Sequence, residues 1–379
     1  MMRKTTFSIL CLEGAILSFN VAAAAALVPS IAADFALSQF FVGRIIWLYM
    51  LPYGLAAFFY GPLVRAFDAR KVELYCIFLF SLANLLAGLS CDIYTLFTAR
   101  FLMGFFGASV IPLGLILIAK RIEKNKRGAF IGIFFGSTFI ASLAGLFLSG
   151  IIHWRLIFII PAVLGFVLWI VMYFYLPSFK EGLSRFHFGY LSAFKDRKII
   201  LIFTYIFLIS FVYHAVQQWL AVYFSTQLFL NQFTISILIT LTSLSGIFGE
   251  VFGGRLADRI GRQKVINLGI LTMIICIFTL LLKLPLGLLS LIMVLWGLGW
   301  TFNHVGLATM LTDLPNEFLN EAASLNSGVR FISGGLGVGL GGAIMKKSFN
   351  LGFLIFGSSL FLLLFFSRIL KLKNNISRS

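Results

Sequence analysis

Glu13 is an acidic side chain set well inside the first long apolar stretch of this sequence. Asn20 follows seven residues later, and this spacing places both side chains on one face of a helix. An ionisable group in apolar surroundings is costly unless it faces a cavity or a partner, so Glu13 is a candidate functional residue. A carboxyl group in such a place can take up and release a proton. The alternative is a structural carboxylate that pairs with an arginine or caps a neighbouring helix.

Further polar side chains interrupt the later apolar stretches. His214, Gln217 and Gln218 stand at positions i, i+3 and i+4 and therefore share one helical face. Such groups can meet a polar ligand within a membrane protein, although each histidine has a hydrogen-bonded structural role as its alternative. For Arg330 we expect a structural role. The expected ligand-binding residues are Asn20, Arg100, His214, Gln217, Gln218, Asn303 and His304.

The sequence contains no residue pattern typical of enzymes. It has no phosphate-binding Walker loop, no zinc-ligand spacing and no catalytic-triad pattern. Its four cysteines, Cys11, Cys76, Cys91 and Cys276, include no CxxC pair and lie in or at the ends of apolar runs. They resemble small hydrophobic residues rather than metal ligands or disulfide partners. We therefore expect no enzymatic activity, no metal and no other cofactor.

The composition indicates that the chain folds in lipid. Of its 379 residues, 60% are hydrophobic and 11% are charged, and the mean hydropathy is +1.01. Soluble domains are about half apolar and about a quarter charged. The lengths of the apolar runs divide the chain into about twelve spans. We therefore predict an all-α membrane protein with twelve transmembrane helices.

The net charge of +17 is distributed as a topology signal rather than as a nucleic-acid-binding surface. Alternate segments between the predicted spans, beginning with the N-terminus, hold 23 of the 30 Lys and Arg residues. Positively charged loops are retained on the cytoplasmic side of a membrane. We therefore predict a multi-pass protein with both termini in the cytoplasm, and no nucleic-acid partner.

The predicted spans form two groups of six. We expect an N-terminal six-helix half at residues 1–177, a basic cytoplasmic linker at 178–198 and a C-terminal six-helix half at 199–379. The first span, about residues 6–28, resembles a signal peptide, but many spans follow it, so we interpret it as an uncleaved helix. The third span is expected over about residues 74–91. Within these limits Glu13 and Glu250 are the only acidic residues in spans, and Glu250 is near the end of its span.

Residues 254–264 form a short basic segment between two long apolar runs, with the sequence Gly-Arg-Leu-Ala-Asp-Arg-Ile-Gly-Arg-Gln-Lys. Gly254 and Gly261 allow a tight reversal. The pattern resembles the cytoplasmic signature loop of the major facilitator superfamily, which joins the second and third helices of each six-helix half. A degenerate copy, Gly-Pro-Leu-Val-Arg-Ala-Phe-Asp-Ala-Arg-Lys, lies at residues 61–71, an offset of 254 minus 61, or 193 residues. The paired offset indicates an internal repeat.

Three shorter stretches extend the resemblance. Residues 28–35 are similar to the first outer loop of drug-efflux members, residues 100–108 to the fourth-helix motif, and residues 154–158 to the connection between helices five and six. The resemblance implies two pseudo-symmetric halves related by an axis along the membrane normal. It also implies that helices one, four, seven and ten line a central cavity for a small-molecule substrate.

The resemblance implies secondary transport by alternating access, which we expect to be proton-coupled efflux of small amphipathic compounds. Glu13 would then be the proton-coupling residue. Arg100 would attract an anion or influence Glu13, with packing support as its alternative. Uptake of a small organic metabolite or anion is a further alternative, because the fifth span lacks the Gly-Pro pair usual in antiporters of the family. A second alternative is a transport-dead membrane sensor, because the first signature loop is degenerate. We expect a monomer in the inner, or cytoplasmic, membrane.

Gating contacts are also implied by the resemblance. The aspartate of a signature loop docks at the start of a helix in the opposite half, so Asp258 is expected to meet Arg127. In the degenerate copy Arg65 replaces this aspartate, and the offset of 193 residues relates Gly128 to Glu321. We therefore predict a charge-swapped contact between Arg65 and Glu321; the alternative is that Glu321 only suits the dipole of its own helix. The expected gating residues are Gly61, Arg65, Arg127, Gly254, Asp258, Arg259, Gly261, Arg262 and Glu321.

Overall fold

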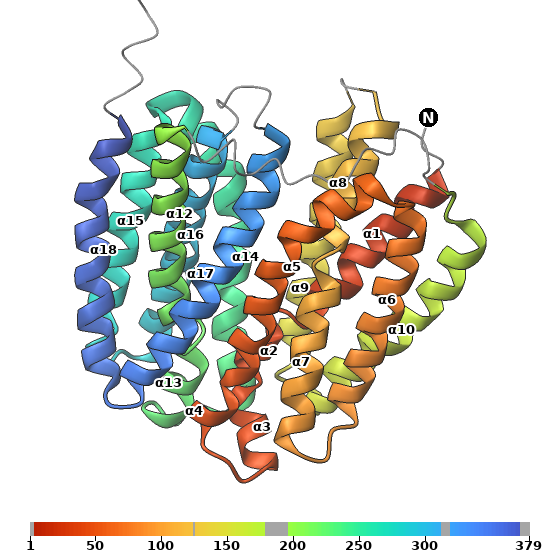
Figure 1. Ribbon diagram of the computed structural model, residues 1–379. Helices are drawn as coiled ribbons and strands as arrows, with labels where there is room; N and C mark the ends of the chain where they lie inside the picture. Colours follow the sequence, from red (N-terminus) through yellow and green to blue (C-terminus); the bar gives the residue numbers. More distant parts are fainter. Residues whose placement is uncertain (1–3, 124–125, 179–195, 312–318, 372–379) are drawn as a thin grey trace, which may run out of the picture. The chain divides into compact units, whose positions relative to one another are not determined.

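The computed structural model of the protein describes residues 4–123, 126–178, 196–311 and 319–371. Within these residues all regular secondary structure is α-helical (Figure 1). Twelve stretches of helix are long and apolar enough to cross a membrane. The predicted fold class and the predicted number of spans are confirmed.

The chain order of the helices is as follows. The first half of the chain forms α1 (Lys4–Phe19), α2 (Ala23–Ala26), α3 (Val28–Asp34), α4 (Gln39–Val42), α5 (Arg44–Ala66), α6 (Ala69–Gly88), α7 (Ile93–Gly107), α8 (Val110–Arg121), α9 (Arg127–Leu148) and α10 (Trp154–Tyr175). The second half forms α12 (Arg197–Gln217), α13 (Leu220–Thr226), α14 (Gln232–Ile260), α15 (Arg262–Thr279), α16 (Leu286–Leu311), α17 (Leu319–Met345) and α18 (Phe349–Lys371). Four spans are built from two consecutive helices each: α1 with α2, α4 with α5, α7 with α8, and α12 with α13.

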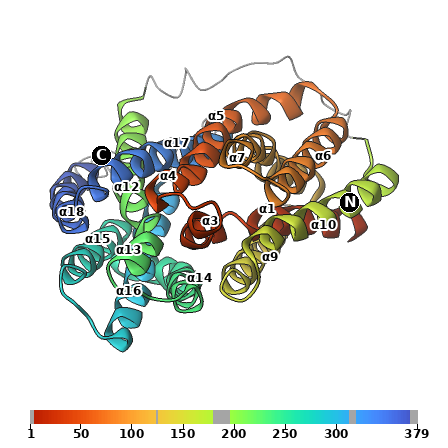
Figure 2. The same ribbon diagram turned by 90° about the horizontal axis from the view of Figure 1, so that it is seen from below.

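The chain divides into two compact units. The first unit comprises Met1–Phe188 and Phe224–Ser236, and the second comprises Gly189–Tyr223 and Ile237–Ser379. In the first unit α1 packs on α9 and α10, α5 on α7, and α6 on α7 and α10. In the second unit α12 packs on α17 and α18, and α15 on α16 and α18. Figure 2 shows the helices of each unit nearly end-on.

Two glycine contacts reveal the internal repeat in three dimensions. A Cβ added to Gly104 of α7 would collide with the carbonyl oxygen of Tyr49 on α5, and a Cβ added to Gly297 of α16 would collide with the carbonyl oxygen of Thr242 on α14. The differences 297 minus 104 and 242 minus 49 are both 193 residues, the offset of the two signature segments. Each unit therefore uses the same close helix crossing at the same place in its repeat.

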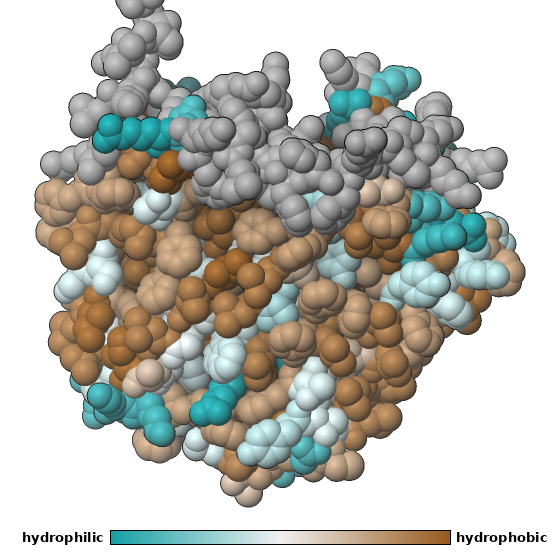
Figure 3. All heavy atoms as spheres, viewed as in Figure 1, coloured by the Kyte–Doolittle hydropathy of each residue, from teal (hydrophilic) through white to brown (hydrophobic). Residues whose placement is uncertain are grey.

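Large apolar side chains cover the outer surface of the helices. Ile140, Phe174 and Leu362 are 70%, 72% and 69% exposed, respectively. Figure 3 shows brown, hydrophobic residues over most of the visible sides of both units, with teal residues gathered toward the helix ends. Such a surface is stable against lipid tails, where helices satisfy their own backbone hydrogen bonds.

The two signature segments turn in different ways. In the second, α14 continues to Ile260 and Gly261, at φ 93°, is the single residue before α15. Gly254 therefore lies inside a helix, and the expectation that it takes part in the reversal is wrong. In the first, α5 ends at Ala66 and Asp68 caps α6, accepting a hydrogen bond from the N–H of Arg70 at 3.1 Å. The third span consequently begins at Ala69 and not at about residue 74.

Candidate functional site

Glu13 on α1 meets a second buried acid, Glu73 on α6, in the first unit. Their side chains are 1% and 0% exposed, and their carboxyl groups are close enough to interact directly. None of the four oxygens has a hydrogen-bond partner of normal geometry. Neither acid forms an ion pair with a residue that the structure describes. Two neighbouring carboxylates in apolar surroundings repel each other, and a proton held by either acid would relieve this repulsion.

Weakly acidic groups surround Glu73. The Cys76 thiol lies 3.4 Å from the hydroxyl of Tyr60, and the hydroxyl of Ser109 lies beside the Glu73 carboxyl group. Asn20, the residue directly after α1, is fully buried and donates a hydrogen bond to Asn84 Oδ1 on α6 at 2.5 Å. A polar seam therefore runs between α1 and α6.

An apolar cluster lies one helical turn from the carboxyl pair. Leu10 precedes Glu13 by three residues and Ala69 precedes Glu73 by four, and both pack with Leu113, Leu117 and further buried residues of α8 and α9. The cluster includes Ala69, the first residue of α6, and lies between Glu13 and the N-terminal end of α1. A proton reaching the pair from that end would have to pass this layer.

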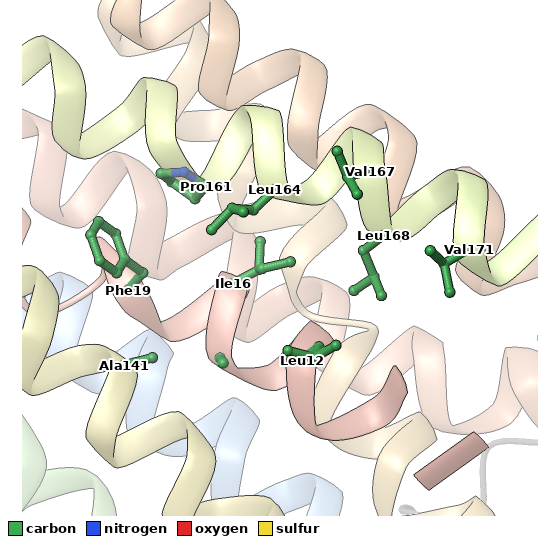
Figure 4. Close-up of a pocket in the computed structure, with 10 residues that line it drawn as sticks. Leu12, Ile16, Phe19, Ala141, Pro161, Leu164, Val167, Leu168 and Val171 are labelled. Carbon is green, nitrogen blue, oxygen red and sulfur yellow. The ribbon is translucent and has the colours of Figure 1, made fainter. Parts of the chain in front are cut away.

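A neighbouring face of α1 borders an apolar groove. Figure 4 shows Leu12, Ile16 and Phe19 of α1 facing residues of α10 such as Leu164 and Leu168. The cavity has a volume of about 260 Å³, and the ten residues that line it are all apolar. Glu13 and Asn20 are not among them, so this groove is separate from the polar seam.

Arg100, on α7, is 1% exposed and takes part in packing between helices. Its Nε donates a hydrogen bond to the carbonyl oxygen of Ile45 at 3.1 Å, and its Cζ lies 4.4 Å from the centre of the Tyr49 ring. One terminal nitrogen has no partner. The structure shows no ion pair between Arg100 and Glu13. A direct influence of Arg100 on Glu13 therefore has no contact to support it.

The predicted polar residues of the second unit gather around tryptophans of α16. Trp296 Nε1 donates to Gln217 Oε1 at 2.7 Å, and Asn303 Nδ2 lies 3.4 Å from the hydroxyl of Tyr205. Gln218 is half-buried next to Gln217.

The two histidines of this cluster have different partners. His214 Nδ1 lies 2.8 Å from the carbonyl oxygen of Ser210 on its own helix, α12. His304 Nδ1 lies 3.4 Å from Glu250 Oε1 on α14. Both rings are half-buried beside Trp300, at centre distances of 5.6 Å for His214 and 6.2 Å for His304. Helices α12, α14 and α16 thus bring His214, Gln217 and His304 to the tryptophans of α16, whereas Asn303 contacts Tyr205 and Gln218 lies just beyond the end of α12.

The expected gating residues are only partly described. Asp258 and Arg259 are exposed on the last turn of α14, and Arg262 begins α15. Arg127 begins α9, and its Nε donates to the carbonyl oxygen of Ile122 at 2.8 Å. Gly61 and Arg65 belong to α5 and Glu321 to α17, but the side chains of Arg65 and Glu321 lie outside the described part of the structure. The pairs Asp258–Arg127 and Arg65–Glu321 therefore stay predictions.

A polar cluster anchors the start of α14 within the first unit. Gln232 Oε1 accepts a hydrogen bond from Ser30 Oγ at 2.7 Å, and its Nε2 donates to the carbonyl oxygen of Ala26 at 2.9 Å. One turn later, the hydroxyl of Ser236 lies 2.9 Å from the hydroxyl of Ser149, the residue that follows α9. These contacts hold residues 232–236 against the ends of α2 and α9.

Two of the resembling motifs meet at Asp34. Trp154 Nε1 donates to Asp34 Oδ2 at 3.0 Å, and Arg155 Nη2 forms an ion pair with the same oxygen at 3.1 Å. Arg155 also donates to the carbonyl oxygen of Ser90 at 2.8 Å. Residues 28–35 and 154–158 therefore form one structural contact that ties α3 to the start of α10.

Sequence reasoning missed Glu73 as a site residue. The basic residues Arg70 and Lys71 placed the expected start of the third span too late, and Glu73 fell outside it. The cap signal of Asp68, an aspartate just before a helical stretch, could have corrected this boundary. Among the described residues, no three His, Cys, Asp or Glu side chains gather where they could hold a metal ion.

Comparisons with known proteins agree with this architecture. A family model described as Major Facilitator Superfamily matches residues 10–342 and 230–375. The uncharacterized MFS-type transporter YbcL of Bacillus subtilis (strain 168) is 24% identical over 314 residues, which are 80% of each chain. The puromycin resistance protein pur8 of Streptomyces alboniger is 33% identical over 132 residues, 34% of this chain and 26% of its own. The crystal structure of the nucleoside transporter NupG has a TM-score of 0.75 at 15% identity and covers 97% of this chain and 100% of its own. The protein belongs to the major facilitator superfamily and is a membrane transporter of that fold.

Proposed function

We propose that the protein exports a small organic molecule by alternating access, in exchange for protons that bind the Glu13–Glu73 pair. The two halves at residues 1–177 and 199–379 would alternate about the substrate, with 178–198 as their cytoplasmic linker. The transporter would act as a monomer in the cytoplasmic membrane, with both termini in the cytoplasm.

The observation that carries proton coupling is the isolation of the two carboxyl groups. A structural acid is normally neutralised by a cation or bound by several donors. Glu13 and Glu73 have neither among the described residues, and they lie close enough to share a proton. Their affinity for a second proton then depends on how much water reaches them, and a change between two conformations would alter this access.

Export is supported by resemblance and by one relative. Residues 28–35 and 100–108 are similar to drug-efflux members, and the relative pur8 is named a puromycin resistance protein. Uptake of a small metabolite is the second candidate, because α9 contains no Gly-Pro pair.

The substrate would bind to the predicted cavity residues. His214, Gln217 and His304 surround aromatic rings of α16 and offer hydrogen bonds beside flat apolar surface. Such a combination suits an amphipathic molecule. Alanine at His214, Gln217, Gln218, Asn303 or His304 should change substrate affinity more than alanine at a lipid-facing Phe does.

The test uses everted membrane vesicles, in which an imposed pH gradient makes the interior acidic. Vesicles containing the protein are offered a panel of cationic, neutral and anionic amphipathic compounds, and the contents are measured by mass spectrometry. The wild type should concentrate at least one compound inside, and the uncoupler-treated control should not. Glu13→Gln and Glu73→Gln should let that compound equilibrate without concentrating it.

A matched control is Glu123→Gln, because Glu123 is exposed and its carboxylate forms an ion pair with the nearby Lys126 at 2.9 Å. This variant should transport as the wild type does. If the compound is instead concentrated inside right-side-out vesicles, the result favours uptake over export. Absence of any gradient-driven movement in either orientation would favour a sensor and contradict the proposal.

A further inference from the structure

Arg330, on α17, is a buried cation in the second unit that the proposed proton route does not use. Its side chain is 8% exposed, and its Nε donates a hydrogen bond to Asn326 Oδ1 at 2.8 Å. Both terminal nitrogens lack a hydrogen-bond partner. A guanidinium group whose donors are buried without acceptors is strongly disfavoured. A negatively charged group placed there would be stabilised.

The backbone of Arg330 is held firmly against α12. Gly337 and Gly341 bring α17 into direct contact with the carbonyl oxygens of Phe211 and Ala215. Ser210 Oγ donates to the carbonyl oxygen of Arg330 at 3.1 Å. The direction of the guanidinium group is therefore fixed by helix packing and by Asn326.

An aromatic surface lies beside this cation. Arg330 Cζ is 5.7 Å from the centre of the Trp300 ring. Tyr213 stacks on Trp300 at 3.9 Å with an interplanar angle of 9°, and also on Trp296 at 5.5 Å. Trp300 is half-buried rather than fully buried. A flat ring could lie against it while an attached charged group reaches Arg330.

The neighbouring histidines leave further groups for a ligand. His214 and His304 use Nδ1 for the contacts with Ser210 and Glu250, and their Nε2 atoms have no partner among the residues that the structure describes. The acid Glu250 contacts His304 and makes no ion pair with Arg330 in the described part of the chain. The positive charge of Arg330 is thus not neutralised by direct contact.

We propose that Arg330, Trp300, His214 and His304 bind the negative group of the substrate, which is an organic anion such as a carboxylate attached to a flat ring. The two terminal nitrogens of Arg330 suit the paired oxygens of a carboxylate. This inference rests on the proposed function only in taking the bound molecule to be the transported one.

The test measures binding to the purified full-length protein by equilibrium dialysis, without a pH gradient. Three probes share one ring system: 2-naphthoate, the neutral 2-naphthamide and the cationic 2-naphthylmethylamine. Because hydrogen bonds between two charged groups are stronger than those to a neutral group, 2-naphthoate should bind more tightly than the amide by about tenfold or more. The amine should bind most weakly.

Variants separate a binding role from a structural one. Arg330→Gln should weaken 2-naphthoate binding about tenfold or more and leave 2-naphthamide binding unchanged. Arg330→Lys, which keeps the charge and protects the fold, should weaken it less. Lys283→Gln removes one exposed charge from the same unit and should have no effect. Thermal unfolding of each variant shows that the compared proteins are folded.

Equal binding of acid and amide, preference for the amine, or unchanged acid binding by Arg330→Gln would overturn the inference. A lipid headgroup is the other possible source of the negative group, and 2-naphthoate displaced by phosphatidylglycerol at equal concentration would also overturn it. Glu13→Gln should bind 2-naphthoate normally. If the wild type binds 2-naphthoate but shows no proton-driven transport, only the coupling is wrong. If the wild type exports amines alone in a proton-driven way, only this site is wrong.

Discussion

Gly104 of α7 lies directly against the carbonyl oxygen of Tyr49 on α5, with no room for a side chain. The pair Gly297 and Thr242 repeats this relationship 193 residues later in the other unit. Tyr49 is also the residue whose ring lies under Arg100. The conspicuous arginine of the fourth-helix motif and its glycine thus stabilise one helix crossing.

Replacing either glycine should therefore destabilise the protein. A leucine at Gly104 or Gly297 would force the helices apart, and overpacking of this kind costs about 1–3 kcal/mol or more. The measurement is thermal unfolding of the purified variants in detergent. Gly132→Ala is the matched control, because a Cβ at exposed Gly132 meets no described atom within 4 Å. It should raise stability by up to about 1 kcal/mol; equal melting of all variants would contradict the packing argument.

Gln232→Leu should release the segment at 224–236 from the rest of the first unit. The change removes the side-chain hydrogen bonds to Ser30 and Ala26. Each partner that is buried then lacks a hydrogen bond, which costs about 1–3 kcal/mol of stability. Hydrogen–deuterium exchange of this segment should become faster. Gln227→Leu, at an exposed position in the same segment, should leave the exchange unchanged. Identical exchange in both variants would show that the polar cluster does not hold the segment.

The degenerate signature copy is expected to gate through a swapped ion pair. Arg65→Glu and Glu321→Arg should each slow transport and increase labelling from the cytoplasmic side, because like charges would then face each other. The double swap should restore both properties. An exposed pair is typically worth under about 1 kcal/mol, and about 1 kcal/mol shifts a two-state ratio roughly fivefold. Additive single effects without rescue in the double variant would exclude the contact.

The charge distribution predicts the orientation in the membrane. Reporter fusions at residue 190 should be active as cytoplasmic fusions, and fusions next to Lys283 should be active as external ones. The opposite pattern would reverse the assignment of every loop.

Most of the fold could be predicted because span length and apolar content follow from the thickness of a bilayer. The error at the third span has a local cause. Arg70 and Lys71 look like loop residues, yet they lie in the first turn of α6, where long cationic side chains can reach past the apolar layer. The guanidinium of Arg70 indeed donates to the carbonyl oxygen of Tyr173 on α10.

The site was less predictable, because its partners come from different helices. The sequence indicates that Glu13 is buried, but not that Glu73 faces it across α1 and α6. Arg330 was expected to be structural, and its Nε does bond to Asn326 on its own helix. Its unpaired nitrogens and the stack of Trp300 on Tyr213 depend on the packing of α12, α16 and α17, which periodicity cannot show.

The central claim is that Glu13 and Glu73 hold an exchangeable proton between them. Infrared spectroscopy of the purified protein in lipid measures it directly, through the carbonyl absorption of protonated carboxylic acids, and needs no substrate. As the pH is raised, the wild type should lose an absorption that is absent from Glu13→Gln and altered in Glu73→Gln, while Glu123→Gln behaves as the wild type. If the wild type and both pair variants show the same carboxylic-acid absorption at every pH, the pair carries no such proton and the account of coupling is wrong.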